Sequence, residues 1–147
     1  MKKPHRALHE LARRVLKTRL AARPRSAAAV ADATQICCGE LYRILETMMG
    51  TAGLQALIER ALQLTARDYP WLTAVTPGPG GDCALTGLSE ATGALDVNDA
   101  AEGAAALLAT IVWLLISFIG EDLTSRLVRN AWPEVSFSRL SESATND

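Results

Sequence analysis

The chain has few aromatic residues, histidines or cysteines. Phe, Trp and Tyr make up 5% of the 147 residues, and there are two His and three Cys. Cys37 and Cys38 are adjacent, so the sequence has no spaced cysteine pairs that would build a disulfide framework. Residues 4–25 also lack the apolar run of a secretory signal peptide. These features argue against a disulfide-stabilised secreted domain, and we expect a reducing, cytoplasmic location.

The scarcity of histidine also bears on catalysis. A nucleophile needs a poised base beside it, and both histidines, His5 and His9, lie at the N-terminus. Their spacing of four would let a helix present both to one metal ion, but two ligands in a cationic segment make a poor metal site. The Pro/Gly run at 77–81 lacks the Gly-Lys-Ser/Thr sequence of a phosphate-binding loop. We therefore predict a protein that is not an enzyme and binds no metal or cofactor.

Alanine and leucine are abundant instead, with 25 and 21 residues. Both are strong helix formers, whereas residues that favour strands are sparse. Apolar residues recur at spacings of three and four through most of the chain, and Gly50 is placed to end one helix just before the next. The expected fold class is an all-α bundle of about five helices, two of them joined at Gly50 as an antiparallel hairpin. The helices are expected at about residues 4–22, 26–49, 51–69, 98–119 and 121–131.

Composition divides the chain into three parts. Residues 1–25 form a basic amphipathic arm, residues 26–133 form the helical bundle, and residues 134–147 form a polar C-terminal tail. Within the bundle, a run of Pro and Gly predicts a long Gly/Pro-rich surface loop over about residues 71–97. One short apolar cluster in it, from Leu85 to Leu95, is expected to form at most one or two helical turns.

An uncharged run of 18 residues, 103–120, is the strongest local feature. As a helix it would span about 27 Å, the lower edge of transmembrane length. Both flanks are acidic and Trp113 lies in the middle, whereas membrane spans favour a basic flank and aromatic ends. The other helices each carry an apolar stripe that needs a common partner. We expect a buried central helix, and a single membrane-spanning helix with a membrane location is the alternative.

Charge is distributed unevenly along the chain. The formal net charge is −1, yet the first 25 positions hold nine basic residues and one acidic residue, and the rest is strongly acidic. On a helix, Arg6, Arg13 and Lys17 gather on one side, opposite an apolar side of leucine and valine. The first helix is therefore amphipathic, with a basic stripe.

The basic stripe predicts contact with an acidic surface, either on another protein or on the acidic body of this chain. Anionic lipid and nucleic acid are alternatives, as is a helix that packs by its leucine side and leaves its basic side in solvent. Nucleic acid is the weaker alternative, because no aromatic residues are interleaved for stacking and the acidic body would repel a duplex. We predict a small non-catalytic adaptor or regulatory module that binds another protein, or a second copy of itself as a homodimer. The predicted contact residues are the basic Arg6, Arg13, Arg14 and Lys17 and the apolar Leu8, Leu11, Val15, Trp71 and Trp132.

Overall fold

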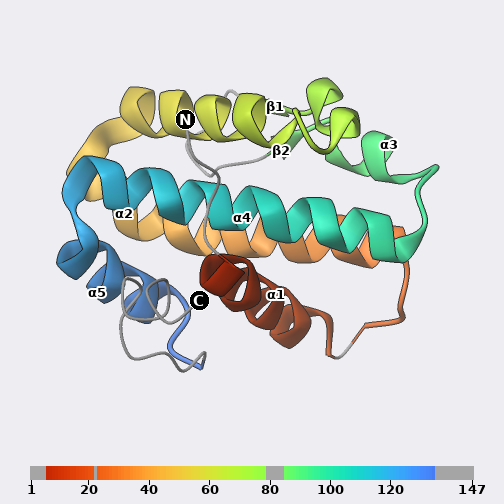
Figure 1. Cartoon of the computed structure of the whole chain (residues 1–147), viewed down its shortest axis with the longest axis horizontal. Helices are drawn as coiled ribbons and strands as arrows, with labels where there is room; N and C mark the ends of the chain where they lie inside the picture. Colours follow the sequence, from red (N-terminus) through yellow and green to blue (C-terminus); the bar gives the residue numbers. More distant parts are fainter. Residues whose placement is uncertain (1–5, 22, 79–84, 135–147) are drawn as a thin grey trace.

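An apolar helix, α4 (Val97–Ile119), lies at the centre of a bundle of α-helices (Figure 1). The computed structural model describes residues 6–21, 23–78 and 85–134. The prediction of an all-α bundle with a central apolar helix is confirmed, because α4 packs against three other helices. The elements are α1 (Arg6–Leu20), α2 (Ala27–Thr65), the 3-10 helix η1 (Pro70–Ala74), β1 (Thr76–Pro77), β2 (Leu85–Thr86), α3 (Leu88–Thr92), α4 (Val97–Ile119) and α5 (Glu121–Ala131).

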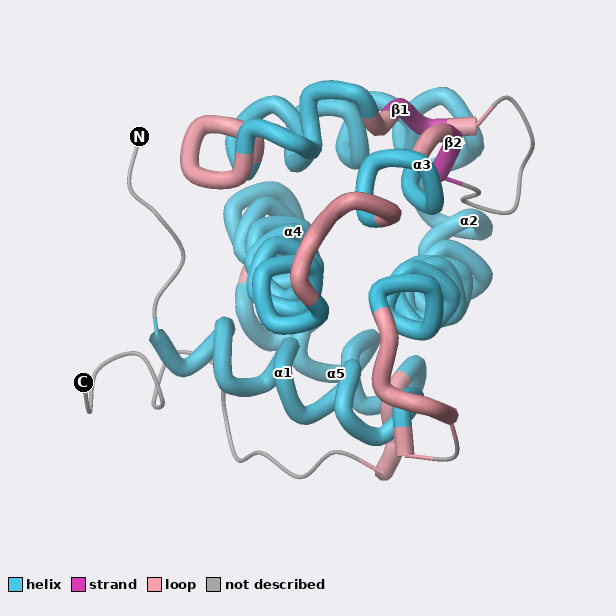
Figure 2. The backbone as a smooth tube through the Cα atoms, turned by 90° about the vertical axis from the view of Figure 1, so that its right-hand side faces the viewer, coloured by secondary structure: helices cyan, strands magenta, loops and turns pink. Residues whose placement is uncertain are grey.

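Helix α2 consists of two halves that meet at Gly50. Ser26 caps its start by accepting a hydrogen bond from Ala29 N at its Oγ. Gly50 has φ 75° and ψ 165°, a left-handed conformation that residues with a Cβ atom rarely adopt. The chain therefore reverses there, and the two halves run in opposite directions in different layers of the bundle (Figures 1 and 2), which agrees with the hairpin expected at Gly50.

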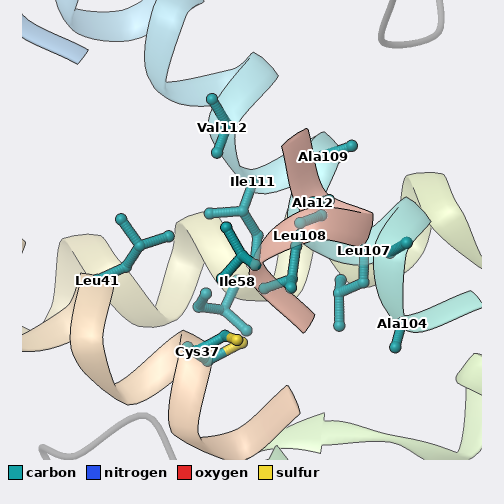
Figure 3. Packing of buried hydrophobic residues seen from close by; sticks show 14 of the residues in the cluster. Ala12, Cys37, Leu41, Ile58, Ala104, Leu107, Leu108, Ala109, Ile111 and Val112 are labelled. Carbon is teal, nitrogen blue, oxygen red and sulfur yellow. The ribbon is translucent and has the colours of Figure 1, made fainter. Parts of the chain in front are cut away.

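Helix α4 owes its central place to its apolar side chains. Every residue from Gly103 to Leu115 is buried except the partly buried Trp113. Among the described residues, α4 is the one helix long and apolar enough to cross a membrane, with a mean hydropathy of 2.0 over 18 residues, and 67% of that window is buried within the protein. Figure 3 shows Leu108 of α4 among side chains of α1 and α2, including Ala12 and Ile58.

Trp71 packs directly on the backbone of α4. Gly103 of α4 lies against the indole ring so closely that a Cβ atom there would overlap it. Glycine at this position therefore lets η1 approach the central helix. Trp71, predicted to contact a partner, is partly buried against the protein's own core.

The prediction of a surface loop over 71–97 is wrong where its described part is anchored in the core, whereas α3 agrees with the short helical turn expected between Leu85 and Leu95. Leu72, Val75, Leu85 and Leu88 are buried in the core. Between them, β1 and β2 pair antiparallel, and Gln35 of α2 donates to Leu85 O at 2.7 Å and accepts from Leu85 N at 2.9 Å. Apolar residues on both sides of the turn-forming sequence thus anchor the segment to the core. The Gly/Pro-rich stretch 79–84 lies outside the described residues.

Candidate binding surface on helix α1

Helix α1 is part of the bundle and not a separate arm. Its apolar side faces α4 and α2, and Leu8, Leu11 and Val15 are at most 3% exposed. Trp132, at the end of α5, is fully buried. These four residues were expected to contact a partner, and that expectation is corrected: they fill the protein's own core, where burial of apolar surface is most favourable.

The opposite side of α1 is exposed and basic. Arg6, Arg13, Arg14 and Lys17 are all exposed. Helical spacing places Arg6, Arg13 and Lys17 together opposite the apolar side, and Arg14 lies at the edge of this group. We call these four residues the basic face. Its direction is fixed, because the apolar side of the same helix is held in the core.

Part of the acidic surface that meets α1 belongs to this chain. Arg13 donates from Nε and Nη2 to the two carboxylate oxygens of Glu102 on α4, at 3.2 and 3.0 Å. After α1 ends, Arg23 forms an ion pair with Asp32 on α2 at 3.3 Å. Both pairs are largely exposed and therefore contribute little stability.

Arg19 makes the most buried of these ion pairs. Its Nε and Nη2 donate to the Glu40 carboxylate, with the shortest distance at 2.7 Å, and its Nη1 bonds Glu134 after α5. Burial alone would lower the pKa of Arg19, but the two carboxylates outweigh it and raise the pKa. This residue lies outside the predicted basic stripe, and its helical position gives the reason: Arg19 falls on the apolar side of α1, four residues after Val15.

The pair between Arg13 and Glu102 is sensitive to acid. The hydrogen bonds from Arg13 hold the pKa of Glu102 below its usual value. Because a lowered pKa stabilises the fold only while the carboxylate is charged, this contribution is present above the usual range of glutamate and is lost as the pH falls through the lowered value. Nearby, burial and then Arg13 lower the pKa of His9, which favours a neutral imidazole.

The two cysteines in the described part of the chain, Cys37 and Cys38, show no feature of a reactive site. Cys37 and Cys38 are both buried. Burial raises the pKa of the Cys37 thiol to about 12, so this thiol stays protonated at neutral pH. Within the described parts of the chain, no three His, Cys, Asp or Glu side chains gather where they would hold a metal ion. His5 and Cys83 lie outside the described residues.

Comparison of the chain with protein-family models, with curated proteins and with solved structures found no match.

Proposed function

We propose that the protein is a small non-catalytic helical module that acts by binding an acidic surface of another protein through the basic face of α1. The observation that supports this proposal is the exposure of four basic side chains on α1, of which Arg6, Arg13 and Lys17 lie together opposite the side that is fixed in the core. A fixed helix has little conformational entropy to lose on binding. Charges presented in this way speed association and orient the partner.

The basic residues of α1 differ in how readily they could bind a carboxylate of a partner. Arg13 already bonds Glu102, so an incoming carboxylate would have to compete for it. Arg6 and Lys17 are exposed and lie on the same side of α1 as Arg13. We therefore expect Arg6 and Lys17 to carry much of the attraction.

Reversing these two charges tests the proposal. We expect the double variant Arg6→Glu/Lys17→Glu to lose at least about tenfold in affinity for the partner, because each substitution replaces attraction by like-charge repulsion. Partners would be captured from an extract with the immobilised wild-type chain, and affinity would then be measured with the purified partner. The matched control is Arg43→Glu/Arg126→Glu, which makes the same charge change at exposed sites on α2 and α5.

Equal affinities of the two double variants would contradict a role for the basic face. Two results would favour the nucleic-acid alternative: nuclease treatment removes the captured material, and the affinity of the chain for that material falls steeply as the salt concentration rises. Recovery of the expressed chain only with detergent would favour the membrane-spanning alternative for α4.

Self-association is a second candidate function, supported by apolar side chains at one end of the bundle. Phe118 near the end of α4 is 66% exposed, and Met48 near the end of the first half of α2 is 47% exposed. The turn within α2 and the turn between α4 and α5 lie at this same end (Figure 1). We propose that two copies meet there, since exposed apolar side chains gain from mutual burial.

Light scattering after size-exclusion chromatography tests this contact. We expect the wild-type chain to have about twice its 15.7 kDa mass at high concentration and Phe118→Asp to have the mass of one chain. The control is Ile36→Asp, which places the same charge at another exposed apolar site, 37% exposed, on α2. A wild-type chain that stays monomeric at all concentrations would contradict self-association.

A further inference from the structure

A cleft opens where the end of α1 and the starts of α2 and α4 meet. Its volume is about 270 Å³. Apolar side chains contributed by all three helices form part of its lining: Leu20, Val30, Val97 and Ala101. The polar side chains that line it are Lys17, Arg23, Arg25 and Ser26. The cleft thus combines an apolar surface with several cationic groups.

The charges around the cleft favour an anion. Its described lining contains three basic side chains and no carboxylate. Arg25 donates a hydrogen bond to the neutral side-chain oxygen of Asn98, so this contact leaves its charge uncompensated. Arg23 is paired with Asp32, but the pair is solvent-exposed, with side-chain exposures of 37% and 63%, and is therefore weak.

Two neighbouring polar groups are already engaged with helix starts. Ser26 Oγ accepts from Ala29 N and caps α2. The carboxylate of Asp96 accepts from Asn98 N and caps α4. An anion in the cleft would therefore be held by the basic side chains, with Arg25 as the principal group.

A larger groove shows no such preference. It is lined by the second half of α2, by η1 and by β1, and has a volume of about 720 Å³. One acidic residue, Glu59, and one basic residue, Arg67, both line it, so its charges select neither anions nor cations. The smaller cleft is therefore the site whose chemistry specifies a ligand.

We propose that the cleft between α1, α2 and α4 binds a small organic anion with an apolar body, of the medium-chain carboxylate class. Ligand sites bury an apolar body against apolar side chains and use a few polar groups to fix its orientation. Arginine suits the carboxylate end, because its planar fork donates two parallel hydrogen bonds to two oxygens. The volume of the cleft suits a small ligand.

This site is independent of the proposed protein-binding function, although Lys17 borders both. Arg25 and Ala101 line the cleft and do not belong to the basic face of α1. Variants at these two positions therefore test the cleft alone.

Sodium octanoate, kept below its micelle concentration, is the probe. In ¹H–¹⁵N NMR spectra of the full chain we expect saturable shifts at Leu20, Val30 and Val97. We expect acetate, which has the charge without the apolar body, and 1-octanol, which has the apolar body without the charge, each to bind at least about tenfold more weakly. Shifts that do not saturate, or acetate or octanol binding as tightly as octanoate, would overturn the proposal.

Two substitutions locate the site. Arg25→Ala removes the principal cation and Ala101→Leu fills the apolar lining, and we expect each to weaken octanoate binding at least about tenfold. Arg43→Ala removes an exposed arginine of α2 outside the cleft and is expected to leave binding unchanged. Circular dichroism checks that the variants fold. If Ala101→Leu does not fold, Arg25→Ala still tests the site, because Arg25 is exposed and its replacement leaves the core intact. Unchanged binding in Arg25→Ala would overturn the assignment.

Discussion

Replacing Trp132 by alanine is expected to lower the free energy of unfolding by about 3–5 kcal/mol. Trp132 follows α5 and is 0% exposed, although it lies only two residues before the end of the described chain. Removing the indole would leave a cavity that the surrounding helices fill only in part. The loss therefore includes both the transfer free energy of the ring and the cost of the cavity.

Urea unfolding followed by far-ultraviolet circular dichroism measures this effect without depending on tryptophan fluorescence. The matched control is Phe118→Ala, which removes another large ring from a position that is 66% exposed, and all chains are measured at a concentration at which they are monomeric. We expect the control to change stability by no more than about 0.5 kcal/mol. Similar losses in the two variants would mean that Trp132 is not a core residue in solution.

A phenylalanine at position 132 separates the apolar contribution of the ring from its polar group. Among the described residues, Trp132 Nε1 is a buried donor without a hydrogen-bond partner. Such a group costs free energy when it is buried unsatisfied. Trp132→Phe removes that donor and keeps an aromatic ring, so we expect it to lose clearly less stability than Trp132→Ala.

The burial of Trp132 also shows which features of the sequence predict burial at the end of a helix. The stripe that contains Thr124 and Val128 continues to Trp132 at a spacing of four, so helical periodicity already placed the ring on the buried side of α5. Its position beside Pro133, at the end of a helix, suggested exposure instead. Periodicity was the better guide, because the apolar side of a helix continues to its last turn.

Burial was harder to predict in the segment from η1 to α3, where apolar residues follow no single helical or strand period. Leu72, Val75, Leu85 and Leu88 are buried, but they belong to η1, β2, α3 and the connection that precedes β1. Helical or strand periodicity cannot link residues in such short elements. The hydrogen bonds that tie Leu85 to Gln35 join positions 50 residues apart, and no local pattern specifies such a pairing.

The sequence predicted the basic residues on the exposed side of α1 but not the acidic residues that pair with the arginines, because no local pattern specifies those pairs. Spacing placed Arg6, Arg13 and Lys17 on the exposed side of α1, as the structure has them. The acidic residues that pair with the arginines near α1, Glu102, Glu40 and Asp32, are brought there by the tertiary fold. One ion pair did have a signal in the sequence. Arg19 lies on the apolar side of its helix, and a charged residue that is buried there requires a partner of opposite charge.

Replacing Glu40 by alanine is therefore expected to cost more than breaking an exposed ion pair. The side chains of Arg19 and Glu40 are 15% and 26% exposed, and Arg19 donates to both oxygens of Glu40. Without Glu40, the largely buried guanidinium of Arg19 keeps, among the described residues, the carboxylate of Glu134 as its acidic partner. We expect Glu40→Ala to lower the free energy of unfolding by about 1.5–3 kcal/mol, the range for hydrogen bonds to charged groups.

The comparison with the exposed pair makes the measurement specific. Asp32→Ala removes the partner of Arg23, whose pair is largely in solvent, and should cost less than about 1 kcal/mol. The double variant Arg19→Met/Glu40→Met removes both charges and keeps apolar volume, so we expect it to recover most of the stability lost in Glu40→Ala. A double variant as unstable as Glu40→Ala would show that the carboxylate stabilises the bundle by packing. Recovery would show instead that the cost of Glu40→Ala comes from leaving the charge of Arg19 without its main partner, on the side of α1 that faces the core.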